Sequence, residues 1–181
     1  HKEVPSFNAD KESEYSFFNE NCLRAAENGF YIVTQLLSKF ITNESNDSNN
    51  NANLIQTLNY GNLSIFKFFM KKMNQQQLRN SLIFAVKRNY INIINYSFNE
   101  IINNEDFNIE ISTDLSFDLL KESITNKTNE MFNYLIDQIK TLDPSFFNEI
   151  AQIDQLLNQV CLYTKNVEMA KILTELIIEK N

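Results

Sequence analysis

Residues 25–37 read Ala-Ala-Glu-Asn-Gly-Phe-Tyr-Ile-Val-Thr-Gln-Leu-Leu, and this stretch decides the fold. Two small residues close a helical segment, Asn28 and Gly29 interrupt it, and apolar residues at helical spacing follow directly. A glycine takes a positive φ without steric cost, so it can end one helix and turn the chain into the next. The stretch therefore predicts a helix, a tight turn and a second helix.

The same pattern recurs along the chain when segments are aligned on the residue that ends each first helix. We call these residues the anchors, and they are Gly29, Gly61, Asn89, Lys127 and Lys165. Four positions before the anchors the residues are small: Ala25, Thr57, Ala85, Ser123 and Cys161. Three positions before them the residues are apolar: Ala26, Leu58, Val86, Ile124 and Leu162. Four positions after them they are also apolar: Val33, Ile65, Ile93, Met131 and Met169. A unit of this kind cannot bury its own apolar face and has to stack on a neighbour.

These repeats favour an all-α fold, an α-solenoid of about five stacked helix–turn–helix units. An ordinary helical bundle, with the spacing aligned by chance, is the alternative. Apolar periodicity predicts helices over 16–28, 30–41, 53–60, 62–73, 76–88, 90–103, 115–125, 128–140, 144–152, 154–164 and 166–179. With only 2 Gly and 2 Pro, the chain lacks the turn residues that hairpin-rich β folds need.

The predicted helices form a single domain over 16–181. Residues 1–15 are a polar, partly disordered lead-in, and the Asn/Ser-rich run 43–52 is a flexible loop because it has nothing to bury. The alternation over 107–111 indicates a short extended piece. Asp143 and Pro144 predict a helix start, with an acidic N-cap followed by proline in the first turn.

The segments 25–37 and 58–69 resemble the helix–turn–helix of an ankyrin repeat, and 85–94, 123–135 and 161–173 look like weaker copies. This resemblance covers about 20–180. The family's Thr-Pro-Leu-His box is missing, since its first position is held by Glu20, Ala52, Asn80, Asp118 and Leu156. The family's hairpin glycines are also absent. The sequence thus leaves open either ankyrin-like helical pairs with irregular connections or another αα-solenoid of similar pitch.

The resemblance implies a non-catalytic scaffold that binds another protein or peptide in a concave groove. In that family the ends of the first helices line the groove. The matching residues here are Glu27, Asn28, Asn59, Tyr60, Lys87, Arg88, Asn126, Tyr163 and Thr164. We expect Tyr60 and Tyr163 to be exposed, whereas Phe66, Phe68, Phe69 and Phe84 belong to packing positions.

Charge is spread unevenly over a chain whose net charge is −7. The segment 48–99 contains no Asp or Glu and carries six cations: Lys67, Lys71, Lys72, Arg79, Lys87 and Arg88. We call this segment the basic middle. It is either a solvated helix surface or a binding zone for an acidic peptide, for nucleic acid or for anionic lipid. The isoelectric point of about 4.8 argues against nucleic acid, because such domains are usually strongly basic.

The residue inventory argues against an enzyme. His1 is the only histidine, so nucleophilic triads and histidine-ligated metals lack their main component. Cys22 and Cys161 are isolated, which we interpret as two small buried thiols rather than a disulfide framework or a zinc site. The acids Asp114, Asp118 and Glu122 share one helix face, as is typical of a solvated surface. We expect no catalysis, no cofactor and no metal.

No apolar run approaches the roughly 18 residues of a membrane span, and no signal peptide is recognisable. The simplest location is intracellular, in the cytoplasm or nucleus. A structural spacer within a longer chain remains a third functional reading, beside the peptide-binding module and the binder of an acidic ligand.

Overall fold

The computed structural model describes residues 20–22, 24–26, 28–41, 61–71, 73–103 and 111–179. The chain divides into two compact units, His1–Met73 and Asn74–Asn181. Every regular element in the described ranges is a helix and none is a strand, which confirms the all-α class. The predicted lead-in 1–15, the loop 43–52 and most of the extended piece at 107–111 lie outside these ranges.

The first unit contains α2 (Tyr31–Ile41) and α4 (Leu63–Met70), which pack against each other. Tyr31 meets Phe68 edge-on with 6.3 Å between ring centroids. The side chain of Asn62 caps α4 by accepting hydrogen bonds from the backbone N–H groups of Ser64 and Ile65 at 3.1 and 3.2 Å. Unpaired N–H groups at a helix start need such an acceptor, so Asn62 fixes where α4 begins.

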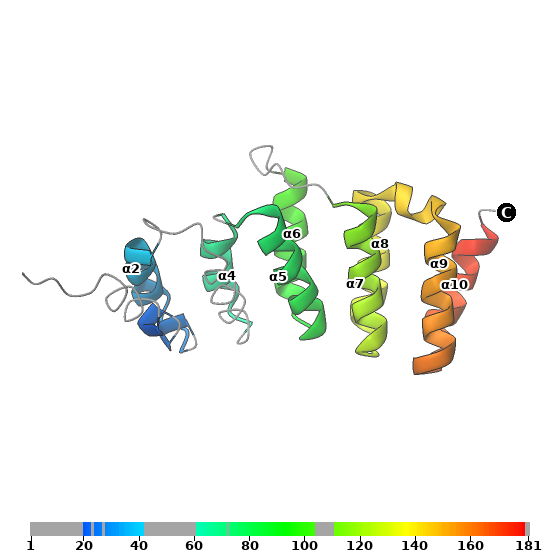
Figure 1. Ribbon diagram of the computed structural model, residues 1–181, viewed down its shortest axis with the longest axis horizontal. Coiled ribbons are helices and arrows are strands. Elements are labelled where there is room, and N and C mark those ends of the chain that lie inside the picture. Colours follow the sequence, from blue (N-terminus) through cyan, green and yellow to red (C-terminus); the bar gives the residue numbers. More distant parts are fainter. Residues whose placement is uncertain are drawn as a thin grey trace, which may run out of the picture. The chain divides into compact units, whose positions relative to one another are not determined.

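The second unit is built from three helical pairs. They are α5 (Gln75–Lys87) with α6 (Ile91–Asn103), α7 (Thr113–Thr125) with α8 (Asn129–Leu142), and α9 (Ile150–Gln159) with α10 (Val167–Ile178). Helices α5, α7 and α9 pack in one layer, and α6, α8 and α10 in the other (Figure 1). This arrangement is an all-α architecture of the helical-repeat type.

All five anchors adopt the left-handed backbone that the alignment predicts. Their φ angles are 72° at Gly29, 62° at Gly61, 58° at Asn89, 58° at Lys127 and 52° at Lys165, and no other described residue has a positive φ. At Asn89 the anchor N–H donates to the carbonyl of Val86 at 3.0 Å, and the next N–H donates to Ala85 at 2.9 Å. The same pair of bonds closes the turns at Gly29 and Lys127, and it satisfies carbonyls that would otherwise be unpaired at a helix end.

The second helix of each repeat begins two residues after its anchor, at Tyr31, Leu63, Ile91, Asn129 and Val167. Each start lies within one residue of the prediction. The small positions Ala25, Ala85 and Ser123 are buried, as predicted. The apolar position four after the anchor is fully buried at Ile93, Met131 and Met169.

The last repeat departs from the predicted pattern. The chain passes from α9 into a π-helical turn, η3 (Val160–Thr164), and the N–H of Lys165 donates to the carbonyl of Val160 at 2.8 Å. A π turn contains one extra residue. As a result Val160 is buried where Cys161 was expected, whereas Cys161 and Leu162 are exposed. The prediction that both cysteines are buried is therefore right for Cys22 and wrong for Cys161.

A phase mismatch accounts for this turn. The buried residues of α9 are Ile153 and Leu156, and Val160 at the start of η3 continues their stripe at spacings of three and four. The alignment expects Cys161 and Leu162 to be buried before the turn. The stripe instead buries Val160, one residue earlier. Without the extra residue, the α9 face toward the core would carry Asp154, and burying an unpaired carboxylate is costly.

Three further predictions need correction. Val33, expected in a packing position, is 45% exposed, and Ile32 and Leu36 of α2 are exposed too, so these three apolar residues are not buried. Phe66 and Phe69 are buried as expected, whereas Phe68 and Phe84 are only half-buried. The helix predicted at 144–152 is instead a short 3₁₀ helix, η2 (Pro144–Asn148), after which α9 begins.

The helix start at Asp143 is confirmed, and it joins α7 to the segment that follows α8. The Asp143 carboxylate is buried and accepts hydrogen bonds from the N–H of Phe146 at 3.2 Å and from the hydroxyl of Ser145 at 2.5 Å. It also accepts one from the hydroxyl of Ser116 on α7 at 2.9 Å. Three donors compensate the cost of burying this acid.

Replacing Lys127 by glycine should stabilise the second unit, because a non-glycine residue in the left-handed region costs roughly 1–2 kcal/mol. We expect Lys127→Gly to raise the free energy of unfolding by about 1 kcal/mol in urea titrations followed by circular dichroism. Lys121→Gly, in the interior of α7, is the matched control and should lower it by about 1 kcal/mol. An equal loss of unfolding free energy in both variants would show that the left-handed backbone at Lys127 does not favour glycine.

Replacing Asp143 by alanine should destabilise the second unit, because three donors lose their acceptor. We expect Asp143→Ala to cost about 3 kcal/mol in the same titration. The exposed Asp137→Ala on α8 should stay within about 0.5 kcal/mol of the wild type. A loss at Asp143 no larger than that of the control would show that the carboxylate does not organise this junction.

Candidate binding surface

The first helices of the second unit end along a common edge. Helices α5, α7 and α9 run in the same direction, so their C-terminal ends and the following anchors lie on the same side of the stack (Figure 1). We call this surface the turn edge. Its residues are Lys87, Arg88, Asn89, Asn126, Lys127, Leu162, Tyr163, Thr164 and Lys165.

Five of the nine predicted site residues lie on the turn edge: Lys87, Arg88, Asn126, Tyr163 and Thr164. Asn28 occupies the equivalent place in the first unit, where its side chain donates to the carbonyl of Arg24 at 2.7 Å. Glu27, Asn59 and Tyr60 lie outside the described residues. The resemblance did not point to the anchors Lys127 and Lys165, although both are exposed beside the predicted residues.

Two adjacent cations of the turn edge stand where α5 ends. Lys87 and Arg88 are both exposed, and the Arg88 guanidinium carbon lies 5.4 Å from the centroid of the Phe84 ring. A cation over an aromatic face is held by the ring's quadrupole. Phe84 thus orients Arg88 while the charge stays at the surface.

Two polar side chains of the turn edge, Asn126 at the end of α7 and Thr164 in the π turn, are bonded internally. The amide of Asn126 donates to the backbone carbonyl of Glu122 at 2.9 Å and to its carboxylate at 3.1 Å. The hydroxyl of Thr164 donates to the carbonyl of Val160 at 3.1 Å and accepts from the N–H of Asn166 at 3.3 Å. Both side chains therefore shape their own turns, which limits what they can offer a partner.

The apolar end of the turn edge lies at the π turn. Tyr163 is 77% exposed, as predicted. Its neighbour Leu162 is 70% exposed, and Val167 at the start of α10 is 81% exposed. Sequence reasoning assigned Leu162 to the buried column and missed it as a surface residue. Tyrosine is enriched among the residues that dominate protein interfaces, so an exposed Tyr next to Leu and Val can serve as an apolar contact.

Hydrogen bonds between successive repeats hold this edge in place. The amide of Asn166, at the start of α10, donates to the amide oxygen of Asn129 at the start of α8 at 2.5 Å. Asn129 in turn donates to the carboxylate of Glu168 at 2.5 Å. Further from the edge, the Tyr134 hydroxyl donates to Asn95 on α6 at 3.1 Å. Each second helix is thus fixed to its neighbour, and the turns are presented on a rigid stack.

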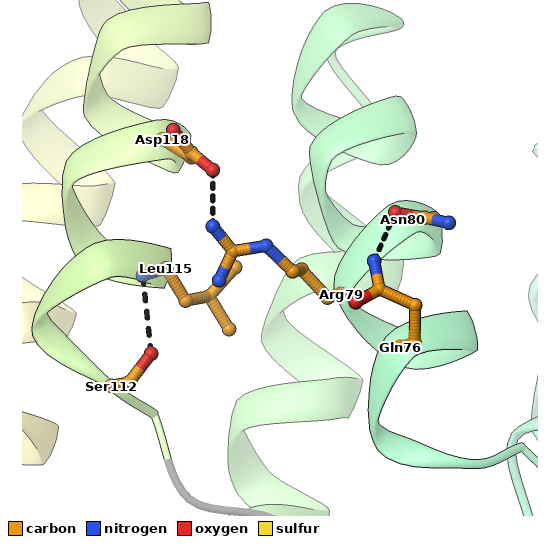
Figure 2. Close-up of polar contacts among 6 residues, drawn as sticks. All are labelled: Gln76, Arg79, Asn80, Ser112, Leu115 and Asp118. Atoms are coloured by element: carbon orange, nitrogen blue, oxygen red, sulfur yellow. Dashed lines mark hydrogen bonds and ion pairs between the residues drawn. The ribbon is translucent and has the colours of Figure 1, made fainter.

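A cavity of about 350 Å³ opens at the opposite ends of α5 and α7. It is lined by Asn74, Gln75, Gln76, Leu78, Arg79, Ser112 and Leu115. Figure 2 shows Arg79 reaching from α5 to the carboxylate of Asp118 on α7, with which it forms an ion pair. Ser112 accepts a hydrogen bond from the N–H of Leu115 at 3.3 Å and so caps α7. Arg79 and Ser112, two polar residues that line this cavity, are therefore already bonded to other residues of the protein.

The ion pair changes the interpretation of the basic middle. Of its six cations, Arg79 is neutralised by Asp118, and Lys72 lies outside the described residues. Lys67 and Lys71 belong to the first unit, whereas Lys87 and Arg88 belong to the second. The cations at the turn edge are thus Lys87, Arg88, Lys127 and Lys165, of which only the first two belong to the basic middle.

Two tyrosines of the second unit have a raised pKa. Burial, together with a hydrogen bond to Glu100 and its negative charge, raises the pKa of Tyr96 to about 12. Burial also raises the pKa of Tyr134. Both groups stay neutral at physiological pH and act as hydrogen-bonding side chains rather than as bases.

Within the described ranges, no three Cys, His, Asp or Glu side chains gather in a way that could hold a metal ion. No described helix combines the length and apolar character that a membrane crossing requires. No family model, curated protein or solved structure matches the chain. The ankyrin resemblance therefore stays a prediction that rests on the residues quoted above.

The shift at Tyr96 predicts a pH effect. A phenol whose pKa is raised in the folded state stabilises the fold below pH 10, and this contribution is lost as the pH rises from about 10 through about 12. We expect Tyr96→Phe to keep its helical circular dichroism to higher pH than the wild type. Tyr163→Phe, which removes an exposed phenol, should leave the alkaline midpoint where it is. The same midpoint for wild type and Tyr96→Phe would refute the linkage.

Proposed function

We propose that this chain is a non-catalytic interaction module that binds an acidic segment of a partner protein along the turn edge. The observation that carries the proposal is the row of exposed cations along this edge, Lys87, Arg88, Lys127 and Lys165, with the exposed apolar side chains of Leu162 and Tyr163 at its last turn. A rigid surface with cations at each turn and an aromatic contact at one end fits an extended peptide with acidic residues and an apolar anchor.

The size of the edge suits a short peptide. Packed helices lie about 8–10 Å apart, so α5 and α9 are separated by roughly 20 Å across α7. An extended chain covers about 3.3 Å per residue, and about six residues therefore span the edge. An interface of this size is typical of weak, reversible recognition.

The proposal includes the ankyrin-like solenoid that the sequence predicts. Its support is the recurrence of a left-handed anchor followed by a helix start two residues later, in all five aligned segments. Two free cysteines, Cys22 and Cys161, suit a reducing compartment, so we place the module in the cytoplasm or nucleus. Binding of nucleic acid or anionic lipid through the basic middle has less support, because Arg79 is paired with Asp118.

The test compares partners captured by the full chain and by charge variants. We expect Lys87→Glu with Arg88→Glu to weaken binding of a captured protein by about tenfold or more, since like charges then face its acidic segment. Lys140→Glu with Lys171→Glu is the matched control, with the same charge change on exposed residues of α8 and α10. Fluorescence anisotropy with the partner's acidic peptide measures the change.

Two outcomes would contradict the proposal. Equal loss of binding in both charge variants would indicate a general effect of net charge rather than a site. Binding of single-stranded RNA or of anionic vesicles with a steep salt dependence, and no peptide binding, would favour the acidic-ligand alternative. A photo-cross-linking residue at position 163 should capture the same peptide, whereas one at the exposed position 155 should not.

A further inference from the structure

The packing of the first helices sets the spacing of the cations on the turn edge. Lys87 and Arg88 lie at the end of α5. Lys127 follows α7, and Lys165 follows the π turn after α9. Helices α5 and α7 pack against each other, and so do α7 and α9. Because the axes of packed helices lie about 8–10 Å apart, the edge presents positive charge about every 9 Å.

These four cations are available to a ligand. All four side chains are exposed, and among the described residues no carboxylate forms an ion pair with any of them. The left-handed backbone at Lys127 and Lys165 fixes the point at which each of these two side chains leaves the surface. A ligand with negative charges at the same interval could therefore meet all three turns at once.

The interval between the turns selects the conformation of a bound chain. In a β-strand the side chains of one face recur about every 6.6 Å, so they would meet the first and third turns and miss the second. In a polyproline II helix every third side chain lies on one face, about 9.3 Å from the one before it. Acidic residues at every third position of such a helix would thus face the three turns in order.

The backbone of the ligand leads to the same choice. Every regular element in the described ranges is a helix, so this part of the chain has no sheet edge with which a bound strand could pair. A polyproline II helix has no internal hydrogen bonds and leaves its backbone to water. It therefore needs no backbone partner on a helical surface.

The apolar end of the turn edge suits proline. Leu162 and Tyr163 are exposed and stand three and two residues before Lys165. Proline-rich chains dock on aromatic side chains with little loss of entropy, because their backbone is ordered before they bind. A proline beside an outer acidic residue would pack against Tyr163 while that residue faces Lys165.

We infer that the turn edge binds a polyproline II segment of a partner protein, with acidic residues at every third position and prolines between them. One outer acid faces Lys87 and Arg88, the middle acid faces Lys127, and the other outer acid faces Lys165. This inference rests on the proposed function, because it specifies the acidic segment that the edge binds.

Two synthetic peptides of equal composition test the spacing on the full chain. The spaced peptide is Glu-Pro-Pro-Glu-Pro-Pro-Glu-Pro, and the clustered peptide is Pro-Pro-Glu-Glu-Glu-Pro-Pro-Pro. We expect the spaced peptide to bind about tenfold more tightly in fluorescence anisotropy at low ionic strength. Its two further acids each reach a turn, and an exposed ion pair strengthens binding about threefold.

Paired changes in the protein and the spaced peptide test the register. We expect Lys127→Gln to weaken binding about threefold, and a Gln in place of the peptide's middle Glu to do the same. The two changes together should weaken it no further, whereas Lys127→Gln should add to a Gln at either outer position. Lys140→Gln, at an exposed position of α8, is the matched control and should leave the affinity unchanged.

The outcomes separate this inference from the proposed function. Equal affinity for the two peptides would overturn the spacing, and it would leave the proposed function intact if Lys87→Glu with Arg88→Glu weakens both. Additive losses from Lys127→Gln and the middle Gln would overturn the register. If neither peptide binds, the inference is wrong, while the proposed function stands as long as a captured partner still depends on Lys87 and Arg88. A captured partner that ignores this double change would contradict both.

Discussion

The structure depends on one backbone constraint, the left-handed residue that ends each first helix. With a positive φ at the anchor, the two N–H groups at Asn89 and Tyr90 turn back to the carbonyls of Val86 and Ala85. The chain is thereby reversed within two residues, and the second helix starts at a fixed distance from the first. Lys127 and Lys165 adopt this conformation at a cost of roughly 1–2 kcal/mol each, which the packing of the pairs has to offset.

Most of the repeat could be predicted from the sequence, because its signals are local. A small residue, an apolar residue and an anchor lie within five positions, and the second helix follows at once. The π turn could not be predicted from those columns alone, since Cys161 and Leu162 match them. The mismatch shows only when the spacing of Ile153, Leu156 and Val160 is compared with the aligned positions, because Leu156 and Val160 fall one residue before the positions that the alignment expects to be buried. The ion pair of Arg79 with Asp118 joins residues 39 positions apart, and no local pattern predicts it.

The location of the candidate surface could be predicted from the sequence, but the chemical character of its side chains could not. Because the anchors fix where each first helix ends, Lys87, Arg88 and Tyr163 had to lie near a turn, and the structure places them there. The apolar end of the surface arises instead from the π turn, which turns Leu162 outward beside Tyr163. A local irregularity in the backbone thus creates the chemical difference between the two ends of the turn edge. Irregular helical turns of this kind are frequently found at functional sites.

The turn edge repeats with the helical pairs, whereas its side chains differ from turn to turn. Each pair adds its own turn to the edge, so different residues at successive turns can recognise the order of residues in a bound chain. Every turn of the second unit presents a cation, from Lys87 and Arg88 through Lys127 to Lys165, but only the π turn adds the exposed Leu162 and Tyr163. An apolar contact at one end of a row of cations makes the two directions of a bound acidic chain unequal, so such an edge distinguishes the direction of a chain as well as its charge.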